Sequence, residues 1–346
     1  MEEINQVEKK AKTGVALVNL GTPDSTRVSD VRKYLTQFLL DARVIDIPEW
    51  NRQLLVRGSI APFRAPKSAA EYKKLWTEEG SPIKIFGYGL RDKLQKRLGE
   101  EYVVSLGMRY QSPSVEESLD MLFKENVSRV IVIPLFPQYA SATVGSVIEE
   151  VMKVVRSNLT FPQLNFVNKF YDRKDFIDAW TSIGNKYDLE KYDKIIFSYH
   201  GIPQRQLFKA DTNNICKANG HCCQEISGKN QFCYSAQCFH NTRLLINSMG
   251  LDSEKCITTF QSRLGRSEWT QPYTEATVER LAVEGYKKVL IFSPAFVADC
   301  LETTVELGME YRDLFLENGG EVFDMVESLN VAEPWVDVLE NMVREY

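Results

Sequence analysis

A histidine near the middle of the chain stands where a sheet protein can carry out chemistry. His200 follows the apolar run 195–197 and precedes Gly201 and Pro203, and the chain has three histidines in 346 residues. In open α/β sheets, the loops after the strands hold the ligands and the reacting groups. Imidazole exchanges protons near neutral pH and binds borderline divalent metals. We therefore expect His200 to accept protons, to bind a metal or to do both, with a buried structural histidine as the alternative.

A row of carboxylates near the C-terminus is a second candidate for chemistry. Glu302, Glu306 and Glu310 recur every four residues, and Asp299 stands three residues before the first of them. On a helix this spacing places the carboxylates on one face, where like charges repel and add nothing to stability. Such a row is useful where a cation or protons pass along it, and a solvated acidic face is the alternative. Because the row follows a predicted strand and a proline loop, Glu302 should lie near His200, and this N/O pair suits transient binding of a divalent first-row metal.

The most cysteine-rich segment is polar and is predicted to need a metal in order to fold. Five of the seven cysteines lie between Cys216 and Cys238, in a segment that contains glycines and few apolar residues. In a reducing compartment, clustered cysteines are more often metal ligands than disulfide partners. Thiolates favour zinc or iron–sulfur clusters, and a bound metal would supply stability that burial alone cannot. A zinc site that includes His221 is one interpretation, and Cys256 and Cys300 are expected to be unligated.

Seven short apolar runs alternate with amphipathic stretches, and they predict the elements that position these residues. The runs are 15–21, 102–107, 129–135, 161–170, 194–198, 256–260 and 288–294. Strands that are apolar on both faces and separated by helices are typical of parallel sheets covered by helices. We predict an α/β protein with two similar Rossmann-like domains, residues 1–165 and 166–346, and the active-site cleft between them. The cysteine insert occupies residues 211–240 of the second domain, and a helix over 242–249 follows it.

Composition and charge argue against several classes of protein. The net charge is −5, with 44% hydrophobic and 26% charged residues, and there is no basic stripe with interleaved aromatic residues. These values are typical of a soluble globular protein and argue against nucleic-acid binding. Residues 1–13 lack the apolar core of a signal peptide, and no apolar run approaches the roughly 20 residues that span a bilayer. We expect a cytoplasmic protein, and the dinucleotide fingerprint and the Walker A loop are both absent from the sequence.

Several segments together resemble ferrochelatases, the lyases that insert Fe²⁺ into a porphyrin in haem synthesis. The matching segments are 18–23, 38–41, 80–83, 107–110, 134–139, 198–203, 260–265, Trp269, 272–274 and 293–296, which leads to Glu302. They run nearly from end to end of the chain. Their combination is specific for the family, although no single segment is. The resemblance implies a ferrochelatase that acts on protoporphyrin IX, with Fe²⁺ as a substrate rather than a cofactor.

The resemblance also implies roles for the two constellations already described. His200 would take pyrrole N–H protons or bind the iron, and Glu302 would be its partner across the porphyrin. Asp299, Glu306 and Glu310 would extend an acidic path away from that pair.

Five residues of the first half are implied in building the porphyrin pocket. Arg109 and Tyr110 match positions on the side of the pocket opposite His200, near the proposed iron entry. Arg64, Tyr72 and Ser81 match positions that hold the porphyrin propionates, and a guanidinium with two hydroxyls suits a pair of carboxylates. Ordinary packing and turn formation are the alternative roles of Tyr72 and Ser81.

Two positions depart from patterns within the family. The residue after Asn19 is Leu20, whereas relatives that act on coproporphyrin usually carry Tyr there. An apolar residue fits a substrate with two propionates, so Leu20 is expected to contact protoporphyrin. Cys300 stands where relatives often carry His, which weakens the case for a catalytic base at that position. The segment 38–63 resembles an apolar lip over the pocket that can touch a membrane, with a simple cap on the first domain as the alternative.

The cysteine segment resembles the internal motif of bacterial ferrochelatases that carry a [2Fe–2S] cluster. Four thiolates complete such a cluster, and the resemblance favours Cys216, Cys223, Cys233 and Cys238 as the ligands. Cys222 is the alternate ligand, because adjacent thiolates such as those of Cys222 and Cys223 point in different directions. The zinc site stays open as the other interpretation.

Two other functions stay open on the sequence. A chelatase of the same fold could insert iron into coproporphyrin, or cobalt or nickel into another tetrapyrrole. A non-enzymatic iron–sulfur or haem-binding sensor could keep the same scaffold, although it would need no path for protons and metal. The sequence also leaves open a homodimer and peripheral contact with the inner face of a membrane.

Overall fold

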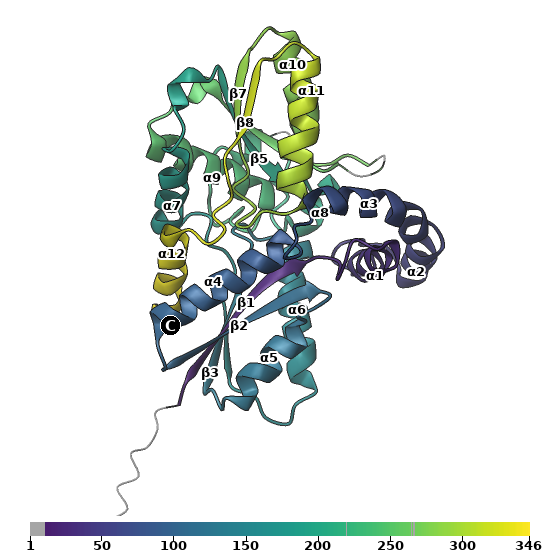
Figure 1. Ribbon diagram of the computed structural model, residues 1–346, viewed down its shortest axis with the longest axis vertical. Coiled ribbons are helices and arrows are strands. Elements are labelled where there is room, and N and C mark those ends of the chain that lie inside the picture. The colour runs from purple at the N-terminus through teal and green to yellow at the C-terminus, as the bar shows by residue number, and fades with distance from the viewer. Residues whose placement is uncertain (1–10, 219, 264, 266) are drawn as a thin grey trace, which may run out of the picture.

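Two four-stranded parallel sheets, one in each half of the chain, form the framework of the molecule (Figure 1). The structure is a computed structural model that describes residues 11–218, 220–263, 265 and 267–346, so the segments 1–13 and 260–265 lie partly outside the described residues. The strand orders are β2-β1-β3-β4 and β6-β5-β7-β8. The strands are β1 (Thr13–Gly21), β2 (Tyr102–Tyr110), β3 (Arg129–Pro134), β4 (Gln163–Phe166), β5 (Lys194–His200), β6 (Cys256–Gln261), β7 (Lys288–Phe292) and β8 (Val322–Met325).

The central strands are buried on both faces, which explains their continuous apolar sequences. In β1, Val15 and Leu17 lie in one core cluster, whereas Ala16 and Val18 lie in a second cluster on the other face. Side chains alternate in this way because successive residues of a strand point to opposite faces of the sheet. Strand β5 alternates between two clusters in the same manner.

Helices cover both sheets and add a lobe that projects from the first half (Figure 1). The α-helices are α1 (Val28–Leu39), α2 (Glu49–Leu55), α3 (Ala61–Leu75), α4 (Pro82–Leu98), α5 (Val115–Lys124), α6 (Ser146–Arg156), α7 (Lys174–Gly184), α8 (Gln204–Ala210), α9 (Tyr234–Met249), α10 (Thr274–Val283), α11 (Arg312–Glu317) and α12 (Glu333–Arg344). The π-helical segments are η1 (Val56–Ile60), η2 (Ser141–Gly145) and η6 (Leu301–Tyr311), and the 3-10 turns are η3 (Leu189–Lys191), η4 (His221–Cys223) and η5 (Ser253–Lys255). Helices α1, α2 and α3 form the projecting lobe.

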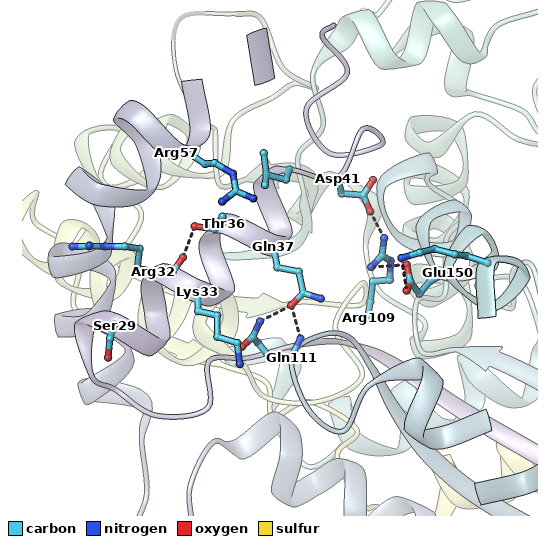
Figure 2. Close-up of a pocket in the computed structure, with 12 residues that line it drawn as sticks. Ser29, Arg32, Lys33, Thr36, Gln37, Asp41, Arg57, Arg109, Gln111 and Glu150 are labelled. Carbon is cyan, nitrogen blue, oxygen red and sulfur yellow. Dashed lines mark hydrogen bonds and ion pairs between the residues drawn. The ribbon is translucent and has the colours of Figure 1, made fainter. Parts of the chain in front are cut away.

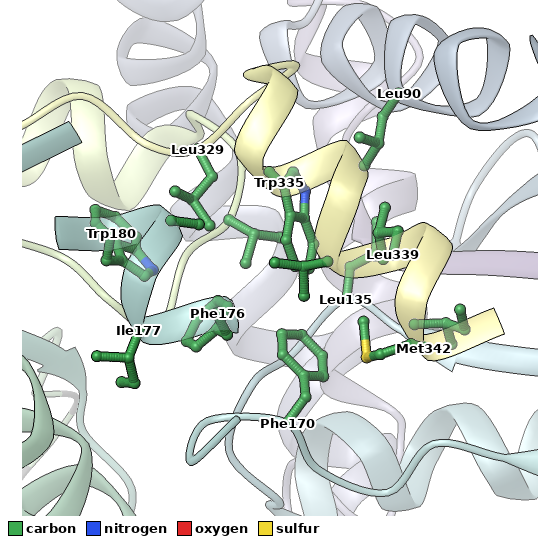
Figure 3. Packing of buried hydrophobic residues seen from close by; sticks show 14 of the residues in the cluster. Leu90, Leu135, Phe170, Phe176, Ile177, Trp180, Leu329, Trp335, Leu339 and Met342 are labelled. Carbon is green, nitrogen blue, oxygen red and sulfur yellow. The ribbon is translucent and has the colours of Figure 1, made fainter. Parts of the chain in front are cut away.

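One hydrophobic core joins the two halves. It contains Leu17 of β1 and Phe197 of β5, together with Trp180 of α7 and Trp335 of α12. Figure 3 shows Trp335 among Phe170, Phe176 and Leu339. Full burial of a large apolar side chain contributes about 1.5–3 kcal/mol to stability. Helix α12 therefore holds the halves together mainly through apolar burial, and it keeps residues from both sheets in a fixed arrangement.

The predicted fold class is confirmed, and two elements differ from the prediction. Strand β8 was missed because four residues that include Asp324 give too weak a pattern. Helix α9 begins at Tyr234 rather than at residue 242, because its first turns bury polar residues such as Gln237 and Asn241 that hide the helical periodicity. Cys238 therefore lies inside a helix. Across the described ranges, every helix is too short or too polar to traverse a bilayer.

Candidate active site

The His200 side chain is held at the end of β5 in a form that can accept a proton. It is half-buried, and its Nδ1 lies 2.6 Å from the carbonyl oxygen of Gly201. A carbonyl only accepts hydrogen bonds, so in the neutral ring Nδ1 carries the proton and Nε2 carries the lone pair. The neutral imidazole can therefore take a proton or bind a metal ion at Nε2.

Aromatic side chains and a close backbone contact surround this imidazole. The ring centroid of His200 lies 6.3 Å from that of Trp269 and 6.4 Å from that of Phe296. A Cβ atom on Gly201 would stand 2.9 Å from the carbonyl oxygen of Gln261. Glycine is thus required at this position, because β5 and β6 approach too closely for any side chain.

Glu302 lies in the first turn of the π-helix η6, whose start is fixed by a reciprocal cap. The side chain of Cys300 accepts from the backbone N–H of Thr303, and the Thr303 hydroxyl accepts from the backbone N–H of Cys300 at 3.0 Å. Burial and the nearby charge of Glu302 raise the pKa of the Cys300 thiol. The side chain of Gln261, which pairs with His200 in the sheet, donates to the Glu302 carbonyl at 3.1 Å. Gln261 therefore contacts both elements of the proposed pair.

The other carboxylates of the row differ in their surroundings. Glu306 accepts from the Ser262 hydroxyl at 2.6 Å and from the Tyr311 hydroxyl at 2.7 Å. Burial, reinforced by the charges of Glu71 and Glu306, raises the pKa of Glu310. Because η6 is a π-helix, its turn is wider than the α-helical turn that the spacing of four predicted.

Asp299 lies before η6 rather than in its first turn. It forms two hydrogen bonds with Asn330, one from the Asn330 side-chain amide at 2.8 Å and one from its own backbone N–H at 2.9 Å. Its other carboxylate oxygen is buried and has no hydrogen-bond partner in the described part of the chain. Asp299 therefore belongs to the loop between β7 and η6, directly before the cap residue Cys300.

An aromatic cluster of the first half packs against η6. The rings of Tyr34 and Tyr72 are 6.1 Å apart and those of Phe38 and Tyr110 are 5.2 Å apart, both in edge-on arrangements. Val305 belongs to the same buried cluster, and Leu20 and Leu301 pack at its edge. Burial and the charge of Glu302 raise the pKa of Tyr34, which places Glu302 beside this cluster. The first half therefore presents an aromatic wall to the helix that carries the acidic row.

Arg109 and Tyr110 belong to a polar network centred on Asp41. Arg109 and Asp41 also line an open cavity of about 780 Å³ (Figure 2). Asp41 lies 2.7 Å from the Arg109 guanidinium, and it accepts from the Tyr110 hydroxyl at 2.9 Å and from the Ser146 hydroxyl at 2.5 Å. Arg109 also lies 3.4 Å from Glu150. Burial opposes ionisation of Asp41, but the Ser146 hydrogen bond, a backbone hydrogen bond and the Arg109 charge outweigh it and lower its pKa. The sequence indicated Arg109 and Tyr110 but not their contact with Asp41, which lies two residues after the end of α1.

The three residues implied in propionate binding have different exposures. Arg64 is exposed on α3. Tyr72 is buried and shares a hydrogen bond with Tyr34. Ser81 is buried as well, and its hydroxyl donates to the Thr22 hydroxyl at 3.0 Å. Arg64 is therefore accessible to an anion from outside, whereas both hydroxyls already have partners within the protein.

Three thiols of the cysteine segment line a small cavity of about 170 Å³. Cys216, Cys222 and Cys233 line it, and the Sγ atoms of Cys222 and Cys223 are 4.0 Å apart. A hydrogen bond from Cys223 lowers the pKa of Cys233 to about 7. Cys238 is fully buried on α9, one turn further along. No three Cys, His, Asp or Glu side chains of the described residues are grouped as ligands of one metal ion.

Comparison with known proteins gives matches over nearly the full length. The family model for ferrochelatase matches residues 12–346. A ferrochelatase of Coxiella burnetii (strain Dugway 5J108-111) is 38% identical, and the match covers 99% of this chain and 96% of the relative. A ferrochelatase of Legionella pneumophila (strain Lens) is 39% identical, with 96% of this chain and 99% of the relative covered.

Solved structures with the same fold include chelatases. SirB from Bacillus subtilis with Fe³⁺ superposes with a TM-score of 0.53 at 11% identity, covering 96% of this chain and 95% of that one. The sirohydrochlorin chelatase SirB from Bacillus subtilis subspecies spizizenii, in complex with cobalt, gives a TM-score of 0.50 at 10% identity, covering 96% and 94%. At such identities these structures support the fold alone, whereas the sequence matches reach further. The chain belongs to the ferrochelatase family.

Proposed function

We propose that this protein inserts Fe²⁺ into protoporphyrin IX to give protohaem. Two pyrrole N–H bonds break, two protons leave, and the four ring nitrogens bind Fe²⁺, so that no oxidant or reductant is needed. The observation that carries the proposal is the membership in the ferrochelatase family over residues 12–346. The imidazole of His200, with Nε2 free to accept a proton, supplies the chemistry that the reaction needs.

The roles of the site residues follow from this geometry. Nε2 of His200 accepts a pyrrole proton or holds the incoming iron, and the Glu302 carboxylate acts from the other face of the porphyrin. Protons or iron pass along Glu306 and Glu310, with Asp299 at the side of this path. Support comes from Gln261, whose contacts keep β5 and η6 at a fixed separation. A positioned acceptor and a positioned carboxylate reduce the cost of bringing metal and ring together.

The porphyrin pocket is proposed to use residues of the first half. Leu20 contacts the ring and favours a substrate with two propionates over coproporphyrin. Arg64 binds a propionate, since it is exposed and has no carboxylate partner among the described residues. Tyr72 and Ser81 can join it only by giving up their present hydrogen bonds.

Arg109 and Tyr110 contribute to the same pocket from the opposite side. Both are tied to Asp41, so we propose that they form its rigid wall. The division into residues 1–165 and 166–346 then separates a half that shapes the pocket from a half that reacts.

The cysteine segment is proposed to hold a [2Fe–2S] cluster. The ligands would be Cys216, Cys223, Cys233 and Cys238, with Cys222 as the alternate, and its Sγ atom 4.0 Å from that of Cys223 supports the alternate. The residues fit such a group, because Cys216, Cys222 and Cys233 line one cavity, the thiol of Cys223 lies 4.0 Å from that of Cys222, and the pKa of Cys233 is lowered to about 7. In a cluster with two irons, each iron binds a pair of thiolates, so three ligands do not have to meet around one metal ion. When bound, it would cross-link a polar segment that buries few apolar side chains.

The choice between cluster and zinc can be tested on the purified protein. Visible absorption with equal amounts of iron and inorganic sulfide is expected for the cluster. Stoichiometric zinc without sulfide would instead favour a site that includes His221.

Location and assembly are also proposals. Trp50 and Phe63 are each 79% exposed and Leu54 is 67% exposed, on α2 and α3 of the projecting lobe. Such an apolar patch suits peripheral contact with a membrane from the cytoplasmic side. Flotation with lipid vesicles tests this contact, and sedimentation tests the homodimer.

The test of the proposed function is metal insertion by the purified protein. Protoporphyrin and coproporphyrin would be compared as acceptors, with Fe²⁺, Co²⁺ and Ni²⁺ as metals. We expect the highest kcat/KM for Fe²⁺ with protoporphyrin and a loss of turnover in His200→Ala. Preference for coproporphyrin or cobalt would favour another chelatase activity, and tight haem binding without insertion would favour a sensor.

A further inference from the structure

A buried tyrosine lies between the cysteine segment and the active-site histidine. Tyr234 is the first residue of α9, is 7% exposed, and directly follows Cys233, the N-cap of that helix. Its hydroxyl donates to the backbone carbonyl oxygen of His200 at 2.8 Å. The Cys238 thiol, one turn along α9, lies near enough to this hydroxyl for each group to affect the pKa of the other. One side chain thus touches both the cysteine segment and the end of β5.

At His200, strand β5 is paired with a neighbouring strand on one side. The position of this backbone therefore also depends on the contact with Tyr234. Strand β5 pairs with β6 up to His200, but its pairing with β7 ends earlier, at Phe197. The peptide unit between His200 and Gly201 is therefore fixed at two points. Its N–H donates to the carbonyl of Gln261 at 2.8 Å, and its carbonyl accepts from Tyr234. The next carbonyl, that of Gly201, is the one that orients the imidazole through Nδ1.

Hydrogen bonds hold the rest of α9 in place. A shift of its first turn would therefore move Tyr234 instead of being taken up elsewhere in the helix. Gln237 accepts from the backbone N–H of Tyr139, in the first half of the chain, at 2.7 Å. Asn241 donates to the Tyr171 carbonyl at 2.7 Å. The backbone N–H of Gln237 donates to the carbonyl of Cys233 at 3.0 Å and so ties the cap to this turn. A displacement of Cys233 would therefore move Tyr234.

We propose that Tyr234 is a positioning residue that couples the cysteine segment to His200. Ligation of Cys233 and Cys238 fixes the first turn of α9, the Tyr234 hydroxyl then fixes the His200–Gly201 peptide, and the Gly201 carbonyl keeps Nε2 of His200 aimed at the substrate. This inference rests on the proposed function, in which His200 reacts with the porphyrin. It gives the cysteine segment a mechanical role in iron insertion.

The first test is the kinetics of Tyr234→Phe, which removes the hydroxyl and keeps the buried ring. Loss of one hydrogen bond that orients the histidine should lower kcat by about five- to tenfold, with the KM for porphyrin unchanged. Tyr192→Phe is the matched control, because Tyr192 is also buried and donates to Asp324 at 2.5 Å, away from His200. Equal kcat in Tyr234→Phe and wild type would overturn the proposal. If Tyr234 had only a structural role, both substitutions would lower the melting temperature and neither would lower kcat.

The second test follows hydrogen exchange of the peptide 198–203 without measuring activity. In the wild type, removal of metal from the cysteine segment with a chelator should raise exchange in this peptide. In Tyr234→Phe, exchange should be raised already and should not respond to the chelator. If exchange in the wild type ignores the chelator, the coupling is wrong. Wild-type iron insertion, measured beside His200→Ala, shows separately whether the proposed function stands.

Discussion

The two halves of the molecule share one sheet topology but carry opposite kinds of side chains at their strand ends. In the first sheet, the central strand β1 ends with Leu20 and Gly21, and β2 ends with the buried Tyr110. In the second sheet, the equivalent central strand β5 ends with His200, and the connection after β7 leads to Glu302. One framework thus supports an aromatic wall in one half and titratable groups in the other.

This difference shows that the fold determines where reactive side chains can lie but not which half contains them. Both sheets place their strand ends and following loops in equivalent positions. The first half uses its positions for burial and for the network in which Asp41 binds Arg109, Tyr110 and Ser146. In the second half, the Nδ1 of His200 is bound to the Gly201 carbonyl, and no hydrogen bond to its Nε2 is found among the described residues. Function resides in the site that the framework carries rather than in the framework.

The largest expected effect comes from the reactive half. Glu302→Gln removes the charge that we propose acts across the ring from His200, and it keeps the size of the side chain. We expect kcat to fall by about 10²- to 10⁴-fold, while the affinity for protoporphyrin, measured by fluorescence quenching, stays within a factor of two or three of the wild type. A change in affinity with an unchanged kcat would mean that Glu302 only helps to bind the ring.

A change in the wall should affect stability more than chemistry. Asp41→Asn leaves the Arg109 guanidinium, which is 12% exposed, without its buried partner. We expect a loss of about 3 kcal/mol in the free energy of unfolding, measured by urea denaturation. An unchanged midpoint of urea denaturation would show that Glu150 alone balances the charge of the Arg109 guanidinium.

The same carboxylate gives a prediction for pH. The pKa of Asp41 is lower in the folded protein than its ordinary value of 3.8 in the unfolded chain. The Asp41 carboxylate therefore stabilises the fold above pH 3.8, and this contribution is lost as the pH falls through the pKa of the folded state. The wild type should therefore lose stability relative to Asp41→Asn below that range. Parallel unfolding curves of the two proteins between neutral and acidic pH would contradict the assignment.

A smaller effect is expected at the cap of η6. Cys300→Ala removes the side chain that accepts from Thr303 and contacts Glu302, at a cost of about 1 kcal/mol and a few-fold loss in kcat. Cys300→Ser keeps an acceptor and a donor, so it should recover most of both losses. Equal behaviour of the two variants in thermal unfolding and turnover would mean that the cap does not position Glu302.

The smallest effect is expected at the exposed contact between α4 and α12. Arg97 pairs with Glu333 at 2.7 Å and with Asp337 at 2.8 Å, with all three side chains about half exposed. Arg97→Ala should lower stability by about 0.5–1 kcal/mol, and high salt should remove the difference. A much larger loss would show that charge, rather than the buried face around Trp335, joins the halves.

The sequence predicts what depends on local pattern. Buried central strands produce runs of Val and Ile, so β1 and β5 are visible without a structure, and His200 is identified by its place after such a run. Strand β8 and the start of α9 are not visible, since one is short and the other buries polar side chains such as Gln237. Contacts between distant residues are also hidden. Asp41 meets Arg109, and Tyr234 meets His200, only after the chain has folded.

The central claim is that the half with His200 reacts while the other half shapes the pocket, and one measurement tests it most directly. Protoporphyrin bound to His200→Ala would be mixed with excess Fe²⁺, and loss of the free-base absorption would be followed in a single turnover. The account predicts porphyrin binding like that of the wild type, with metal insertion slowed by at least about 100-fold. Insertion at the wild-type rate would contradict it.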